Sequence, residues 1–381
     1  MRSASPAERE RRLVGLRTQM DEHGYDVLLV CGRGDEFMRG RIQYVSDIFQ
    51  WAGWGFVLVP RTGDPVFVAD PLGGFDDGSP NTWVSDARLT QQPGTVIAGL
   101  VRELTTATAT VGIAGLADIA AAAHVRELED SLPGVSLTDA TDVFDDFRAI
   151  KSAEEVANLE ETSHILRTVF TALEAEIRPG VLERDVLSEA HRLCRQFGCV
   201  DGIALMGRPP AAGFGWGSDH AIKPDDVIVI DLEWGGPSGY WLELRRCFSF
   251  GEPPADVRRY WESRVEAFDA CVAAVKPGAS SNEILAARDR VYQRYGLTAG
   301  DEDVRYTAHG IGIDSLEPPW VPGTERALQE GMVLSLHPQI ALPPSEVERY
   351  GGVSVGDSVL VTGNGARRLT YETEQWVVLH G

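Results

Sequence analysis

One segment of the chain occurs twice, and this repeat limits the fold more than any other feature of the sequence. Residues 178–198 (RPGVLERDVLSEAHRLCRQFG) match residues 276–296 (KPGASSNEILAARDRVYQRYG) at Pro-Gly, at an acid-aliphatic-Leu step, at an aromatic ring and at the final glycine. Each copy begins with Pro-Gly, continues with an acidic first turn and ends with a glycine at the C-cap. This is the sequence pattern of a helix that follows a turn. The repeat predicts two similar halves related by a pseudo-twofold axis, with their strands in a shared sheet. The length of the match argues against two unrelated helices.

The first copy of the repeat leads to a strand pair that carries two acids. A β-branched run ends at Asp231, a glycine-rich turn follows, and an apolar, aromatic run then carries Glu243. We expect these two carboxylates to face each other across one hairpin. Such a pair suits a metal site or acid–base chemistry; the alternative is that both acids only pair with Arg245 and Arg246.

The second copy leads to two histidines. His309 lies in the sequence HGIG, where glycines let the backbone come close to a ligand. His337 follows the apolar run MVLSL and precedes a proline, so we expect it at a strand end. A single histidine is more often a structural residue than a ligand, but two that converge with two carboxylates indicate a functional site.

The first 150 residues have a different pattern, which alternates helical and strand-like segments. This alternation is typical of an α/β domain. We expect helices at 7–23 and 117–132 and strands at 25–31, 55–59, 65–69 and 111–114. A long helix then begins with the capping-box pair Ser152 and Glu155. We therefore place a domain boundary between residues 150 and 151, as expected for a chain of 381 residues.

Charge and cysteine content narrow the partners and the compartment. A formal net charge of -22 argues against nucleic acid or an anionic membrane surface as a partner, because both would repel the protein. No segment resembles a signal peptide or a membrane span. The five cysteines have no metal-ligand spacing, so we expect reduced, non-catalytic thiols in the cytoplasm.

These features, taken in order, resemble the pita-bread family of methionine aminopeptidase, aminopeptidase P, prolidase and creatinase, in its two-domain branch. Residues 10–47 resemble the creatinase-type N-terminal domain, and IKSAEEVANLEE resembles the start of the pita-bread domain. The resemblance covers nearly the whole chain. It implies an α/β creatinase-like N-terminal domain at 1–150 and an α+β pita-bread catalytic domain with the internal repeat at 151–381.

The same resemblance implies a catalytic site that this chain only partly keeps. Peptidases of the family hold two metal ions with two Asp, one His and two Glu. Asp231 and His309 match the first Asp and the His. Glu243 stands at the second Asp, His337 at the first Glu and Gly356 at the last Glu. Because the last Glu bridges the two metals, its loss makes an ordinary dinuclear peptidase a poor interpretation.

What remains is Glu243, His309 and His337, with Asp231 close by. This set suits one divalent ion (Fe, Mn, Zn or Co), or acid–base chemistry with no metal. The hypothesis we favour is a hydrolase that cleaves a C–N bond in a small amino-acid-like substrate, as creatinase and ectoine hydrolase do on this fold. The alternatives are a residual Xaa-Pro peptidase with one metal, a non-haem iron oxygenase or lyase, and a non-catalytic binding protein.

The resemblance also suggests residues that contact the substrate. Two positions where the family often has further histidines carry Leu316 and either Phe214 or Trp216. Three aromatic residues and one acid are our candidates for the pocket wall: Trp216, Tyr240, Trp241 and Glu317. Because two-domain relatives are homodimers, we expect a homodimer in which Arg39 or Arg41 holds a substrate carboxylate across the interface. Solvated loop charges are the alternative reading of both arginines.

Overall fold

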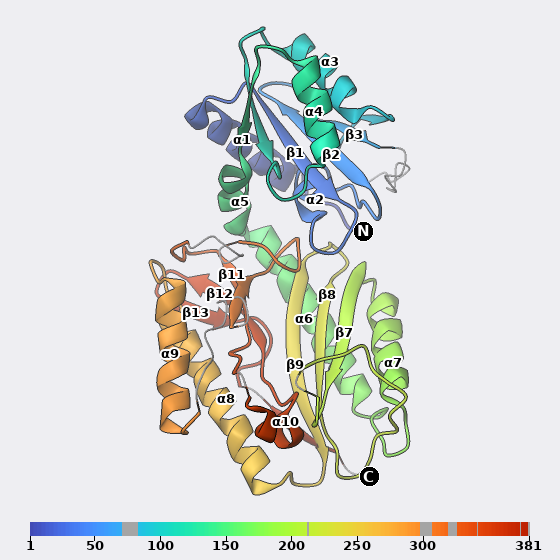
Figure 1. Cartoon of the computed structure of the whole chain (residues 1–381), viewed down its shortest axis with the longest axis vertical. Coiled ribbons are helices and arrows are strands. Elements are labelled where there is room, and N and C mark those ends of the chain that lie inside the picture. The colour runs from blue at the N-terminus through green and yellow to red at the C-terminus, as the bar shows by residue number, and fades with distance from the viewer. Residues whose placement is uncertain are drawn as a thin grey trace. The chain divides into compact units, whose positions relative to one another are not determined.

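The computed structural model describes residues 1–70, 83–211, 213–297, 307–318, 326–340, 342–373 and 375–379. The chain divides into two compact units, Met1–Arg148 and Ala149–Gly381. This division falls two positions before the boundary expected from the sequence, and each unit has its own sheet structure and apolar core (Figure 1).

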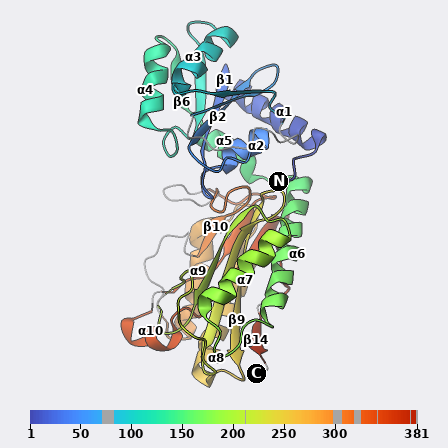
Figure 2. The ribbon, with the colours of Figure 1, turned by 90° about the vertical axis from the view of Figure 1, so that its right-hand side faces the viewer.

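The N-terminal unit is an α/β domain with one six-stranded sheet in the order β4-β3-β2-β1-β5-β6. Its strands are β1 (Val27–Arg33), β2 (Trp54–Pro60), β3 (Val66–Ala69), β4 (Asp86–Leu89), β5 (Thr110–Ala114) and β6 (Ser136–Asp139). Its helices are α1 (Pro6–His23), α2 (Gly40–Ser46), α3 (Pro93–Leu104), α4 (Ala122–Ser131) and α5 (Thr141–Ala149). Figure 2 shows α3 and α4 on one side of this sheet and α1 and α2 on the other.

The expected elements of this unit are present, with shifted ends. Helix α1 begins after Ser5, whose Oγ accepts a hydrogen bond from Glu8 N at 3.2 Å, and ends at Gly24 with a φ of 71°. Helix α4 starts at Ala122, five residues later than expected. Its predicted start failed because the chain forms a turn after Gly115, which has a φ of 92°.

The C-terminal unit contains two four-stranded sheets, in the orders β14-β9-β8-β7 and β10-β11-β12-β13. The strands of the first sheet are β7 (Asp201–Gly207), β8 (Val227–Gly235), β9 (Trp241–Phe250) and β14 (Trp376–Leu379). Those of the second are β10 (Ala308–Gly310), β11 (Val333–Leu336), β12 (Asp357–Thr362) and β13 (Gly365–Arg368). The helices are α6 (Ala153–Leu173), α7 (Glu183–Gln196), α8 (Ala255–Ala274), α9 (Ser281–Arg294) and α10 (Pro344–Tyr350).

The repeat corresponds to these two halves. Its helices are α7 and α9, and each is preceded by a longer helix, α6 or α8. Figure 1 shows α6 and α7 beside the first sheet, and α8 and α9 beside the second. The expectation of one shared sheet was wrong, since the halves form separate sheets. Backbone hydrogen bonds still join them: Arg245 N donates to Gly356 O at 3.0 Å and Trp241 N donates to Gly312 O at 2.6 Å.

The helices of the described residues include none with the length and apolar character that a membrane crossing requires.

Candidate active site

Strand alternation divides β8 and β9 into a helix-facing side and a side that carries ionisable groups. On the helix-facing side, Trp234 contacts His191 of α7 and Phe248 contacts Phe170 of α6. Residues two apart on a strand share a face, so Asp231 and Glu233 of β8 lie on the other side, with Glu243 and Arg245 of β9. The ionisable groups therefore collect on the face away from the helices.

The register of this hairpin corrects one expectation. Asp231 lies opposite Arg245, and Glu243 lies opposite Glu233. Asp231 and Glu243 share a face but are not direct cross-strand partners, because the turn between the strands shifts their pairing by two residues. A cation therefore opposes the first carboxylate, and a second carboxylate opposes Glu243.

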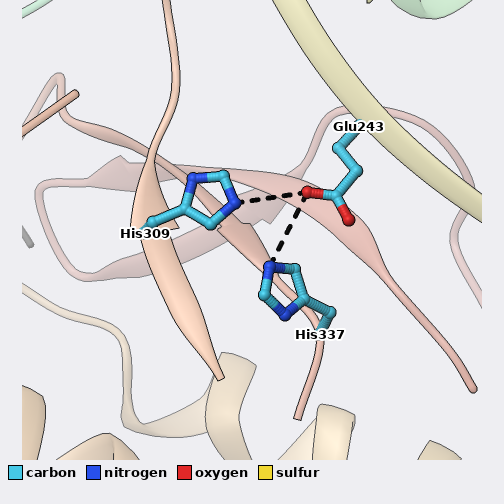
Figure 3. A group of neighbouring side chains, drawn as sticks. All are labelled: Glu243, His309 and His337. Atoms are coloured by element: carbon cyan, nitrogen blue, oxygen red, sulfur yellow. Dashed lines mark ion pairs between the residues drawn. The ribbon is translucent and has the colours of Figure 1, made fainter. Parts of the chain in front are cut away.

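Three side chains from different strands converge at one point, as Figure 3 shows. His309 Nε2 lies 3.3 Å from Glu243 Oε2, and His337 Nε2 lies 3.7 Å from the same oxygen. One ligand atom from each residue can be chosen so that all lie within 4.8 Å of one another. All three side chains are buried. The convergence of these residues was a sequence-based expectation, and this geometry agrees with it.

The second sheet aims both imidazoles at Glu243. His309 lies on β10, and His337 follows the last residue of the adjacent antiparallel strand β11. The Nδ1 of His309 hydrogen-bonds to Gly310 O at 2.9 Å, which leaves Nε2 directed at the carboxylate. Ser335 Oγ donates to Glu243 Oε2 at 2.6 Å and fixes the acid in turn.

The charges at this point stabilise Glu243 as a carboxylate. Burial raises the pKa of Glu243, but His337, Arg245 and His309 outweigh burial and hold that pKa well below its usual range. Burial lowers the pKa of His309, yet the neighbouring Glu243 carboxylate makes the net shift upward. An anionic oxygen donor beside two imidazoles is the chemistry of a divalent metal site.

Glu233 is a site residue that the sequence analysis missed. Its carboxylate accepts a hydrogen bond from Ser315 Oγ and lies opposite Glu243 in the strand pair. Burial and, after it, the charge of Glu243 raise the pKa of Glu233 to about 7. The signal was present in the sequence, since a residue two positions after Asp231 on a strand must share its face.

Arg245 occupies the space between the two acids of the hairpin. Its Nε donates to Asp231 Oδ2 at 2.9 Å, and its Nη2 lies 2.7 Å from Glu243 Oε1. A Cβ atom at Gly356 would stand 2.9 Å from Arg245 Cδ and 3.2 Å from His337 Cβ. A glutamate at position 356 is therefore incompatible with Arg245 as it is placed. The guanidinium supplies a positive charge where a second metal would need the missing acid.

The aromatic candidates and Glu317 have separate environments. Tyr240 is corrected to a core residue, because its hydroxyl donates to Glu155 Oε1 of α6 at 2.8 Å. Trp241 is buried and shares the face of Glu243. Glu317 forms a buried ion pair with Lys151, so it is a structural residue here. Trp216 is 68% exposed and lines a cavity of about 590 Å³.

The two arginines of the N-terminal unit have internal partners. Arg39 Nε donates to Asp35 O at 2.8 Å, and its guanidinium lies 4.5 Å from the ring centroid of Phe49. Arg41 hydrogen-bonds to both Asp118 and Asp145. Arg41 is thus not a solvated loop charge, because four hydrogen bonds tie it to carboxylates of its own unit.

The buried pairs of Arg41 give a prediction about stability. Asp145 accepts from Arg41 at 2.6 and 3.0 Å and from Arg148 Nε at 2.7 Å. Asp145→Asn removes the carboxylate that two buried guanidiniums share. We therefore expect the free energy of unfolding of the N-terminal unit to fall by about 3 kcal/mol or more. Urea unfolding at pH 7 measures this loss. The exposed Asp130→Asn serves as the control, and equal stability of the two variants would contradict the prediction.

The sign of the pH dependence follows from the same contacts. Burial raises the pKa of Asp145, but Arg148 and Arg41 outweigh it and hold the pKa far below its usual range. A depressed carboxyl pKa contributes stability above the unfolded value of about 3.9. This contribution to stability is lost as the pH falls through the lower pKa that Asp145 has in the folded protein. The difference between the parent and Asp145→Asn should therefore shrink only in strong acid.

Comparisons with known proteins agree with the fold. Residues 157–363 match metallopeptidase family M24, which is more than half of the chain, and residues 12–150 match the creatinase/prolidase N-terminal domain. The chain belongs to metallopeptidase family M24. The resemblance inferred from the hairpin, the histidines and the repeat is confirmed, as is the two-domain fold class.

Relatives and solved structures extend this result. The chain is 33% identical over 234 residues to the Xaa-Pro dipeptidase of Pyrococcus furiosus, an alignment that covers 60% of this chain and 65% of that protein. It is 30% identical over 252 residues to the probable dipeptidase PepE of Mycobacterium tuberculosis, covering 64% of each. The structure of dipeptidase PepE from Mycobacterium ulcerans superposes with a TM-score of 0.78 at 26% identity, over 100% of both chains.

Family M24 implies the use of a divalent metal, and the residues present fit one ion. Glu243, His309 and His337 supply a carboxylate and two imidazoles within 4.8 Å of one another. Arg245 lies between Asp231 and Glu243, and position 356 is a glycine, so the acid that the resemblance expects to bridge two ions is absent.

Proposed function

We propose that this protein is a hydrolase that cleaves the amide C–N bond of a small peptide, in the manner of the Xaa-Pro dipeptidases it resembles, with one divalent metal ion. The convergence of Glu243, His309 and His337 carries this proposal. A binding protein has no need for two buried imidazoles aimed at one buried carboxylate, and the two curated relatives described above bear dipeptidase names.

Different residues would have different roles in such a hydrolysis. Glu243, His309 and His337 would hold the ion, which when bound polarises the substrate carbonyl and lowers the pKa of water. Glu233 lies opposite Glu243 and would accept the proton of the attacking water. Ser315 holds one oxygen of Glu233 by a hydrogen bond, which keeps the carboxylate oriented.

Arg245 would replace the second metal in this proposal. Its guanidinium lies 2.9 Å from Asp231 and 2.7 Å from Glu243 and orients both acids without another cation. Glu243 remains ionised, whereas burial raises the pKa of Asp231 to about 8 in spite of Arg245. Because a guanidinium has no open coordination position, it cannot activate water. The activation would rest on the single ion and on Glu233.

Metal analysis combined with turnover tests the proposal. After loading with Mn²⁺ or Co²⁺ and removal of excess, we expect about one ion per subunit and hydrolysis of Xaa-Pro dipeptides. Two tightly bound ions would contradict the role of Arg245. Chelator-resistant hydrolysis by a protein without metal would favour creatinase-like chemistry. Oxygen consumption with Fe(II), or no turnover of any amide, would contradict the hydrolase.

The assembly and the compartment are the finer part of the proposal. We propose a homodimer on the resemblance to two-domain relatives, and a cytoplasmic location on the five buried free thiols. Sedimentation tests the first point, and a stable, fully active monomer would contradict it.

A further inference from the structure

Arg264 of α8 is a buried cation without an acid partner. The side chain is 2% exposed. Its Nη1 donates to Tyr260 Oη at 3.3 Å and its Nη2 to Ser354 Oγ at 3.4 Å, and its Nε has no hydrogen-bond acceptor within the described part of the chain. No ion pair links Arg264 to a carboxylate among those residues.

Several other buried arginines of the protein have a carboxylate partner, which Arg264 lacks among the described residues. Each of five pairs with at least one carboxylate: Arg12, Arg41, Arg148, Arg245 and Arg288. Burial of a charge without a counter-ion is unfavourable. Arg264 is further opposed by its neighbour Arg245, whose Nη1 donates to the same Ser354 Oγ at 3.2 Å. A negative charge from outside the chain would relieve both effects.

A cavity beside Arg264 has room for such a charge. Its volume is about 50 Å³, and its lining includes Phe214, Arg264, Gln339 and Ser354. This space exceeds the about 10–15 Å³ that a cavity needs to hold one water molecule, so it can take a small polar group. The cavity shares Gly213 and Phe214 with the larger one of about 590 Å³, where the rest of a ligand would fit.

The cavity is linked to the proposed metal site through Ser354 and Arg245, and its own lining contains none of the three convergent ligands. Ser354 Oγ accepts from Arg245, and Arg245 lies 2.7 Å from Glu243, the residue that both imidazoles approach. The guanidinium of Arg245 also lies 4.9 Å from the ring centroid of Phe214, which lines both cavities. A ligand with one end in the small cavity would therefore have to extend past Arg245 to reach the reacting groups.

We propose that Arg264 binds a carboxylate of the substrate, through the edge formed by its Nε and Nη2. This edge has one unused donor and one long hydrogen bond, and a planar guanidinium edge matches two carboxylate oxygens. The inference rests on the proposed hydrolase and makes it more specific. The substrate is a dipeptide or another small amide with a free carboxylate close to the scissile bond, and not the interior of a long peptide.

A thermal-stability experiment tests the subsite without any need for turnover. Acetate is the probe, compared with chloride at matched ionic strength. We expect acetate to raise the melting temperature of the parent and of Arg290→Met, an exposed control on α9, and to leave that of Arg264→Met unchanged. Without acetate, Arg264→Met should be at least as stable as the parent, because methionine buries no unpaired charge.

Each other outcome decides against the subsite. No acetate response in the parent, or an equal response in Arg264→Met, would overturn it. If Arg264→Met fails to fold, Arg264→Lys replaces it. Lysine keeps the charge but lacks the two-donor edge, so its acetate response should be clearly smaller than that of the parent, and an unchanged response would again overturn the proposal.

Kinetics with matched substrates separate this inference from the proposed function. Arg264→Met should raise KM for Ala-Pro about tenfold or more and raise KM for the Ala-Pro amide much less, while the exposed control Arg290→Met should change neither. A parent protein that responds to acetate but hydrolyses neither compound would refute the hydrolase alone. Equal KM values for Ala-Pro in the parent and in Arg264→Met would refute the subsite alone.

Discussion

Replacement of His337 by alanine is expected to remove the metal ion and the activity together. The proposed centre has three protein ligands, and His337 supplies one of its two nitrogens. Even the loss of a residue that only supports a metal ligand reduces affinity about 10- to 100-fold. We therefore expect His337→Ala to lower metal affinity by about a hundredfold or more, so that the purified variant contains almost no metal.

Metal content and folding are measured on the same sample. His337 lies just beyond the end of β11, so its removal should leave the strand pairing and the far-UV circular dichroism unchanged. His164→Ala, at an exposed position of α6, is the matched control and should keep both metal and activity. A His337→Ala protein with full activity would show that this histidine is only structural.

The His337→Ala variant also distinguishes an enzyme that uses a metal ion from one that works without metal. If the parent itself contains no metal and still hydrolyses its substrate, His337→Ala should abolish turnover with no change in metal content. Two ions in the parent would contradict both versions, because Arg245 stands between Asp231 and Glu243 and Gly356 supplies no bridging carboxylate.

The fold was predictable because its signals are local or repeated. The capping box at Ser152 and Glu155 formed as expected, with Ser152 Oγ accepting from Glu155 N at 3.2 Å and Glu155 Oε2 accepting from Ser152 N at 2.8 Å. The repeat correctly indicated two matching halves. Whether their strands formed one sheet or two depends on contacts between segments far apart in the sequence, such as Arg245 with Gly356, and no local pattern encodes them.

The site was predictable as far as residue type and strand position determine it. Glu243, His309 and His337 converge because each lies on a strand or at a strand end of one core. Glu233 was missed because the prediction rested on Asp231, which ends the β-branched run, although strand alternation alone places Glu233 on the same face.

Arginine partners were the least predictable part of the site. A guanidinium on a long, flexible side chain reaches several groups, and sequence position does not say which one it chooses. Arg245 was expected to be at most a partner of the hairpin acids, and it also fills the space that Gly356 leaves. Arg41 has two carboxylate partners and Arg264 has none among the residues that the structure describes, and this contrast exists only in three dimensions.

Glu233→Gln is expected to abolish turnover while the metal remains bound. Glutamine keeps the shape of Glu233 and can keep the hydrogen bond with Ser315, but it cannot accept the proton of the attacking water. Loss of a general base lowers kcat by about 10²- to 10⁴-fold. Because Glu233 is not one of the three convergent ligands, metal content should stay at the parent level.

Glu243→Gln provides the matched comparison for this result, since the two acids lie opposite each other and the substitution is the same. It should lose the metal as well as the activity, because an amide oxygen is a poorer ligand than the carboxylate that both imidazoles approach. If Glu233→Gln keeps the metal but loses kcat, Glu233 is the general base. If Glu243→Gln loses the metal, Glu243 is a metal ligand. Full kcat in Glu233→Gln would move the proton acceptor to another residue, and loss of metal in that variant would make Glu233 a fourth ligand.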